Sequence, residues 1–171
     1  MKQIDTYSKL AEFGRELLNK KSLLEGLPLI SKYVKDVISA QRCSIFIYDM
    51  PNRELWTTLA DGIDRISVPY ESGIVGHTIA EKKPIVENDA YSNPHFLKEI
   101  DEQTGYKTEN LITAPIFNSK RQIIGVLELL NKEGGFDSDD VKFMIFFAHY
   151  ISGFLELTNI YLKEDKTHEK I

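Results

Sequence analysis

The hydrophobic positions near the start of the chain follow a helical period. From residue 4 onward they recur every three or four positions, which predicts an amphipathic helix that ends near Lys21. The same spacing over residues 22–39 predicts a second helix. The first apolar face is expected to hold Ile4, Tyr7, Ala11 and Leu18 with Gly14 in the missing place, and the second Leu24, Leu27, Ile30, Val34 and Val37.

The middle of the chain changes to a period of two, which is typical of strands. Residues 43–48 and 54–59 flank a stretch of turn-forming residues, so we expect a hairpin there. A short helix is predicted from Gly73 to about Glu81. Further strands are expected at residues 65–69, 84–87, 110–117 and 122–130, and the last two should be central in the sheet.

Residues 88–108 form a long polar connection between two of these strands. Pro94 lies near the start of a short helix that we expect to run through Ile100. Long connections with structure of their own are often functional. This connection is therefore a candidate for part of a site.

The last hydrophobic pattern predicts a long helix that starts near Asp137. Capping and acidic residues gather there, and both suit a helix start. No glycine or proline stops the pattern before Ile171, and its seam is expected to pack on a partner helix. The seam consists of Ala148, Ile151, Leu155, Thr158 and Leu162.

Helices at both ends of about six strands predict an α/β sandwich. We expect the terminal helices on one face of the sheet, and the short helices and the 88–108 connection on the other. A length of 171 residues fits a single domain.

Composition and charge narrow the class of protein. The chain is 42% hydrophobic and 27% charged, as soluble globular proteins are. Its net charge of −5 and scattered lysines and arginines argue against nucleic-acid binding. The first residues lack the continuous apolar stretch of a signal peptide, so we expect no export, and no run approaches the ~20 apolar residues of a membrane span. With Cys43 as its one cysteine it forms no internal disulfide, and we expect a cytoplasmic setting.

Glu128 is the one charge in an otherwise apolar strand, and a buried carboxylate is costly unless it is paired or hydrogen-bonded. Two interpretations are open. Glu128 faces outward or pairs with a lysine, or it accepts hydrogen bonds from an amine of a ligand.

Other candidate chemistry is weaker. The glycines of 73–76 open a helix, whose free N–H groups attract an anion such as a phosphate, although glycines before a helix are usually only turns. The four histidines have no metal-site spacing, so we expect no metal. No motif for nucleophilic or acid–base catalysis stands out, and we expect no catalytic residues.

Five ordered blocks resemble the GAF domains of cyclic-nucleotide phosphodiesterases and bacterial adenylyl cyclases. The resemblance spans residues 22–157, between a helix at 1–21 and the end of a signalling helix at 158–171, so that 1–171 is expected to be one GAF domain with that α/β fold. The blocks are Gly73-Ile-Val-Gly-His77, Asn88 to Phe96, Thr104-Gly-Tyr-Lys-Thr108, Ala114-Pro-Ile-Phe117 and Ile124 to Lys132.

The resemblance also implies a structural clamp beside a ligand pocket. Cyclic-nucleotide-binding members carry an Asn-Lys, a Phe and an Asp-Glu in order, and pair the lysine with the aspartate. Val141 stands where the family has the glutamate. The matching positions are Asn131, Lys132, Phe136 and Asp140.

The pocket positions carry over in the same way. The resemblance assigns one group to the base, one to the cyclic phosphate, and one to the segment that folds over the ligand. Glu128 matches a strand carboxylate that points into the cavity. The three groups are Ser44, Ala60 and Asp61; Ile74 and Val75; and Asp101, Thr104 and Thr108.

The resemblance implies a regulatory sensor that is not itself an enzyme and uses no cofactor. A cyclic nucleotide, cAMP in preference to cGMP, would order the 88–108 segment and shift the terminal helices. These helices would form a homodimer and carry the signal to an output domain beyond Ile171, without nucleic acid or membrane as a partner.

Three alternatives belong to other classes. Some GAF domains serve only dimerisation or bind other small ligands. A methionine sulfoxide reductase built on this fold works through several cysteines, of which this chain has only Cys43. A haem or bilin sensor would need a pocket histidine, such as His77 or His95, or a cysteine.

Overall fold

The computed structural model describes residues 2–17, 19, 23–49, 52–60 and 67–168. Two helices, α1 (Lys2–Leu17) and α2 (Leu23–Ile38), precede the sheet, and α5 (Ser138–His168) follows it. The strands are β1 (Ala40–Asp49), β2 (Glu54–Ala60), β3 (Ser67–Pro69), β4 (Ile85–Glu87), β5 (Leu111–Phe117) and β6 (Ile123–Lys132). Three short helices lie between strands: α3 (Gly73–Glu81), the 3₁₀ turn η1 (Ala90–Ser92) and α4 (Lys98–Thr104).

The strands form one six-stranded sheet in the order β3-β2-β1-β6-β5-β4. Every described strand pair is antiparallel, which confirms the predicted α/β fold. The expectation of two central strands holds for β6 but not for β5, which lies one strand from the edge. Ser44 of β1 lies opposite Glu128 of β6 in the middle of the sheet.

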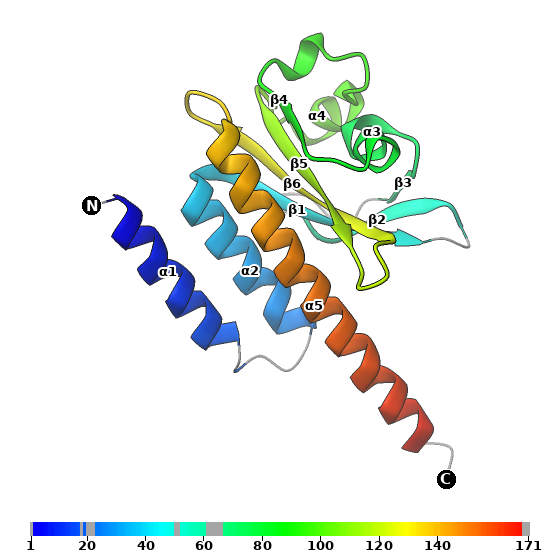
Figure 1. The fold of residues 1–171 in the computed structure, drawn as a ribbon. Coiled ribbons are helices and arrows are strands. Elements are labelled where there is room, and N and C mark those ends of the chain that lie inside the picture. Colours follow the sequence, from blue (N-terminus) through cyan, green and yellow to red (C-terminus); the bar gives the residue numbers. More distant parts are fainter. Residues whose placement is uncertain (1, 18, 20–22, 50–51, 61–66, 169–171) are drawn as a thin grey trace.

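The sheet separates two layers of different character (Figure 1). On one face α1, α2 and α5 lie side by side, and on the other lie α3 and α4. The helix-covered face buries the main hydrophobic core, which includes Ile30, Val34, Ile45, Leu127 and Met144. The terminal helices therefore share one face, as the sequence predicts.

The first helix turns a different side to the core than its apolar spacing predicts. Tyr7 of the expected face is 66% exposed, whereas Phe13 is completely buried. The Phe13 ring lies 5.2 Å from that of Tyr33 and 5.7 Å from that of Phe147, measured between centroids. Leu10 and Leu17 pack around the same core. The predicted face is wrong because it was drawn through a few apolar residues and a glycine, and left out the larger apolar residues that pack on the core.

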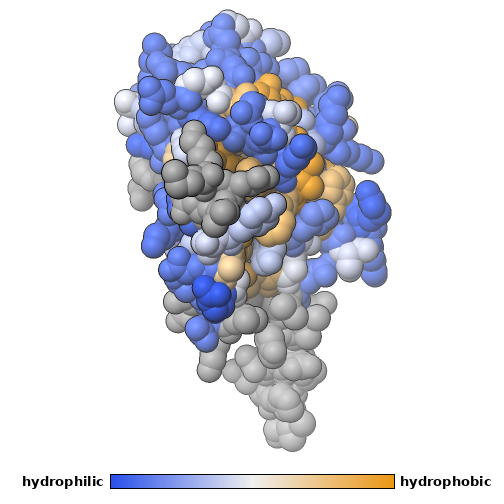
Figure 2. Space-filling view, turned by 60° about the vertical axis from the view of Figure 1, so that its left-hand side comes forward, coloured by the Kyte–Doolittle hydropathy of each residue, from blue (hydrophilic) through white to orange (hydrophobic). Residues whose placement is uncertain are grey.

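The part of the predicted α5 seam that the structure describes packs against the chain's own core and not against a partner helix. Ala148, Ile151 and Leu155 of α5 are all buried in its own core. The side chains of Thr158 and Leu162 lie outside the described residues. Among the side chains of α5 that the structure describes, the exposed large hydrophobic ones are Ile145, Phe146 and Tyr150. Figure 2 shows another view of the surface, where hydrophobic residues gather near the middle of a mostly hydrophilic face.

The covering segment, as we call residues 88–108, differs from its predicted form. The helix expected from near Pro94 through Ile100 begins only at Lys98, and η1 precedes it. Short side-chain contacts shape the intervening turns: Asn93 Oδ1 accepts a hydrogen bond from His95 N at 2.8 Å, and Ser92 donates to Asp89. Such side-chain bonds to nearby groups favour turns over helix.

Candidate functional site

A cavity lies between the sheet and the covering segment, on the face opposite the main core. It holds about 730 Å³ of empty space, including the solvent at its mouth. The lining residues from the strands are Arg42, Ser44, Phe46, Val68, Leu111, Glu128 and Leu130, and those from α3, α4 and the loops include Ser72, Gly73, Ile74, Val75, Phe96, Leu97, Ile100, Asp101, Thr104, Tyr106 and Thr108.

Alternation along β1 decides which residues reach this cavity. Successive side chains of a strand point to opposite faces. Ser44 and Phe46 line the cavity, whereas Cys43 and Ile45 are buried in the helix-covered core. The chain's one cysteine therefore lies on the face of the sheet away from the cavity.

Glu128 reaches the cavity from β6, directly opposite Ser44. It has no hydrogen bond or ion pair with any other residue that the structure describes, so the interpretation that it pairs with a lysine or faces outward is wrong. Burial raises the pKa of Glu128 to about 7, and the negative charge of Asp101 adds to the rise. This carboxyl group is thus free to change its protonation state or to bind a ligand.

The start of α3 supplies backbone donors at the cavity wall. The first N–H bonded within the helix is that of Gly76, which donates to Ser72 O at 3.0 Å. Ser72 makes no side-chain cap, and the first turn carries no acidic residue. The N–H groups of an uncapped first turn attract anions. Ile74 and Val75 lie at this helix start and line the cavity.

Asp101 holds the covering segment together instead of leaving its oxygens open. Its Oδ2 accepts hydrogen bonds from the Thr108 N–H at 2.7 Å and from the Tyr91 hydroxyl at 2.8 Å. Its Oδ1 accepts from the Thr108 hydroxyl at 2.9 Å. Both oxygens of this buried side chain are therefore occupied as acceptors. Asp101 and Thr108 line the cavity mainly as parts of its frame.

Thr104 lines the cavity at the end of α4 but is itself exposed. Its hydroxyl donates to Ile100 O of the preceding turn at 2.9 Å. The Thr104 hydroxyl oxygen also accepts a long hydrogen bond of 3.4 Å from the Tyr106 N–H. The side chain thus helps end α4 at the cavity edge.

Two lining residues that the sequence analysis missed lie stacked at one end of the cavity. The Arg42 guanidinium carbon is 3.6 Å from the centroid of the Tyr106 ring. The Tyr106 hydroxyl donates to Gln41 Oε1 and accepts from Asn131 Nδ2, each at 2.9 Å. The period of β1 could have pointed to Arg42, since it shares a face with Ser44.

Asn131 anchors the end of the covering segment to the sheet. Besides bonding Tyr106, its amide donates to Lys107 O at 2.8 Å. Its oxygen accepts from the N–H groups of Glu109 at 2.7 Å and Asn110 at 3.2 Å. The backbone of Asn131 has a φ of 58°, a left-handed conformation that asparagine tolerates better than most residues.

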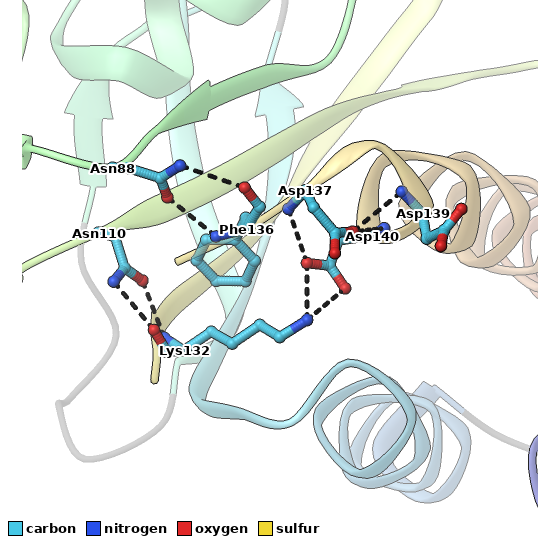
Figure 3. Close-up of polar contacts among 7 residues, drawn as sticks. All are labelled: Asn88, Asn110, Lys132, Phe136, Asp137, Asp139 and Asp140. Atoms are coloured by element: carbon cyan, nitrogen blue, oxygen red, sulfur yellow. Dashed lines mark hydrogen bonds and ion pairs between the residues drawn. The ribbon is translucent and has the colours of Figure 1, made fainter. Parts of the chain in front are cut away.

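Figure 3 shows how α5 is fixed to β6 at its first turn. The Lys132 ammonium lies 2.7 Å from Asp140 Oδ1 and 2.8 Å from Oδ2. The buried Phe136 packs in the main core. Its backbone N–H and C=O both bond to the side chain of Asn88, at 2.9 and 3.1 Å. The start of the covering segment and the start of α5 are thereby joined.

The structure does not describe the side chains of the other two positions expected to bind the base, Ala60 and Asp61. Ala60 ends β2 opposite Ser44, and all of Asp61 lies outside the described residues.

The part of the chain that the structure describes contains no group of three or more His, Cys, Asp or Glu residues able to hold a metal ion. His77 and His95 stack with ring centroids 4.2 Å apart, and neither lines the cavity. None of the described helices is long and apolar enough to cross a membrane.

Comparison with known proteins places this geometry in a family. The model of the GAF domain matches residues 22–155. The GAF domain of a phosphoenolpyruvate-protein phosphotransferase from Coxiella burnetii superposes with a TM-score of 0.82 at 17% identity, over 92% of this chain and 96% of that one. Free methionine-R-sulfoxide reductase from Neisseria meningitidis gives 0.76 at 18% identity, over 91% of each chain. The GAF domain of the Acinetobacter phosphotransferase gives 0.78 at 18%, over 92% and 97%. The chain belongs to the GAF domain family.

Proposed function

We propose that this GAF domain is a regulatory sensor that binds a cyclic nucleotide, cAMP in preference to cGMP. The observation that carries the proposal is the unpaired carboxyl group of Glu128 in a cavity that also contains the uncapped start of α3. A cyclic nucleotide has an anionic phosphate and a base with N–H donors. The two features of the cavity match the two ends of that ligand.

The phosphate would bind at the first turn of α3. The N–H groups at Ile74 and Val75 have no acidic neighbour in that turn, so they offer partial positive charge to an anion. Gly73 has a φ of 71°, which favours glycine at the bend into the helix.

The base would lie between the apolar walls and Glu128. Phe46, Leu111 and Leu130 provide apolar contact on the sheet side. Glu128 would accept from an exocyclic amine, and Ser44 lies beside it in register. Arg42, which also lines the cavity, can donate to a ring nitrogen.

The signal would leave through the terminal helices to an output domain. Asn88 joins the covering segment to Phe136, and Lys132 joins β6 to the first turn of α5. Ordering of the segment by ligand can shift α5 only if the ligand binds the ordered state better.

In a homodimer through these helices, the exposed residues Ile145, Phe146 and Tyr150 would form the contact. Sedimentation equilibrium of wild type and Phe146→Ser tests this part, and a monomeric wild type with and without ligand would contradict it.

The proposal gives the domain no catalytic step. Reduction of a sulfoxide by a thiol would need a cysteine at the cavity, and Cys43 lies on the opposite face of the sheet. Turnover of free methionine sulfoxide with a thiol reductant would contradict this part of the proposal.

Isothermal titration with cAMP and cGMP tests the binding proposal directly. The protein should be unfolded and refolded first, to remove any nucleotide that co-purifies. We expect binding at micromolar or tighter levels, weakened at least about tenfold in Glu128→Ala. Glu133→Ala, which removes an exposed carboxylate, is the matched control and should bind as wild type does. No binding of either nucleotide would leave a GAF module that serves dimerisation or another ligand.

A further inference from the structure

The cavity contains two carboxyl groups with opposite surroundings. Asp101 accepts three hydrogen bonds, from Tyr91 and twice from Thr108. Glu128 has none from the described residues, although both line the same space. One carboxyl group is thus committed to the frame, and the other is available to a ligand.

The charges around Glu128 do not neutralise it. Among the described residues that line the cavity, the other charged or titratable groups are Arg42 on β1, Asp101 on α4 and Tyr106 after α4. Those from α3, β3 and β5 carry no charge. Arg42 lies against the Tyr106 ring and forms no ion pair with Glu128. Burial and the charge of Asp101 raise the pKa of Glu128 to about 7.

The two protonation states of a carboxyl group have different hydrogen-bonding patterns. When neutral it presents one donor and one acceptor, and when ionised it presents acceptors only. Adenine offers N6–H as a donor beside N1 or N7 as an acceptor, which fits the neutral form. Guanine offers N1–H and N2–H, two adjacent donors, which fit the ionised form.

We propose that protonation of Glu128 sets the choice of base in this cavity, with the neutral acid selecting adenine and the carboxylate selecting guanine. This inference rests on the proposed function and limits its preference for cAMP to the protonated state of Glu128, so that the sensor reads pH together with ligand. Side chains with one donor and one acceptor are known to recognise adenine: in protein–DNA complexes, Asn and Gln bind this base through two hydrogen bonds. Glu128→Gln therefore imitates the protonated state permanently.

The experiment measures the affinity for cAMP and for cGMP by isothermal titration at a series of pH values from about 6 to about 8. An apparent Kd rises in proportion as the binding-competent form becomes scarce. Because the pKa of Glu128 is about 7, we expect the cAMP affinity to fall about tenfold across this range and the cGMP affinity to rise about tenfold. The Kd ratio would change by up to about a hundredfold.

Glu128→Gln keeps every other titratable group, so pH effects from elsewhere persist in it. We expect it to prefer cAMP at every pH with a constant ratio of the two Kd values. If this variant does not fold, Glu128→Ala takes its place: it removes the carboxyl group altogether and should likewise show a pH-independent ratio of the two Kd values.

The outcomes separate the inference from the function beneath it. Binding of both nucleotides with a pH-independent ratio in wild type would overturn the inference and leave the sensor proposal intact. A ratio that changes equally in Glu128→Gln would also overturn it, because another group would then be responsible. Absence of binding at every pH would overturn the sensor proposal itself, and the inference with it.

Discussion

The two faces of the sheet are closed in different ways. On the helix-covered face, aromatic and aliphatic side chains such as Phe13, Ile45 and Phe147 are completely buried in one hydrophobic core. On the cavity face, the covering segment is held by hydrogen bonds that the side chains of Asp101 and Asn131 accept from backbone N–H groups. Packing of the first kind supplies most of the stability of a domain, whereas a hydrogen bond adds only about 1 kcal/mol. We therefore expect the covering segment to unfold locally at a lower free-energy cost than the helix-covered face.

The largest expected effect breaks the packed face. Phe147→Ala removes a completely buried ring that lies edge-on to Phe13, so we expect the free energy of unfolding to fall by about 3–5 kcal/mol. Urea denaturation measures it. Phe96→Ala, at the cavity wall where the ring is only partly buried, is the control and should cost less. Equal losses would mean that the two faces do not differ in this way.

The next effect concerns pH and the cavity face. Burial raises the pKa of Glu128 to about 7 in the folded state, while in the unfolded chain the group has its ordinary pKa of 4.5. Stability of wild type relative to Glu128→Gln should therefore fall as pH rises between these values and then level off. The total is up to roughly 3 kcal/mol. Denaturation of both proteins at a series of pH values measures it, and parallel curves would contradict the burial of this charge.

A smaller effect separates frame from ligand contact. Asp101→Ala leaves the buried N–H and hydroxyl of Thr108 without their partner, which costs about 1–3 kcal/mol. The damage should be local, so hydrogen exchange should accelerate over residues 88–108 but not in α2 or α5. Uniform acceleration throughout the molecule would instead indicate that the two faces unfold together.

The smallest effect weakens the same network from outside. Tyr91→Phe removes one hydroxyl from Asp101 but keeps the ring, which is 38% exposed. We expect a loss of about 0.5–1.5 kcal/mol, confined to the covering segment. A double-mutant cycle with Asp101→Ala checks the coupling. Additive losses would show that the Tyr91 hydroxyl does not stabilise the segment through Asp101.

The regular parts of this fold could be predicted from the sequence because their signals are local. The bounds of α3 match the prediction, since its glycines and apolar residues mark its start and length. The alternation of β1 and β2 likewise predicts their pairing. The face of α1 could not be predicted, because Phe13 is fixed by rings of α2 and α5 that are distant in sequence.

The site shows the same division. Glu128 could be singled out because a charge inside an apolar strand needs a reason. The resemblance pointed to Ser44, Ile74 and Thr108, which do line the cavity. The contact between Arg42 and Tyr106 could not be predicted from the sequence. The two residues are distant along the chain and meet only because the covering segment runs back to the sheet. Nor could the sequence show that both carboxylate oxygens of Asp101 accept hydrogen bonds from residues of the covering segment itself.

The position of Cys43 has a practical consequence for spectroscopy. The chain's one thiol is 0% exposed, within the packed face, so maleimide reagents should not reach it while the protein is folded. A cysteine introduced at an exposed place such as Glu102 of α4 would then be the sole reactive thiol, with no need to remove the native one. A single dye or spin label placed there would report the movement of the cavity wall directly.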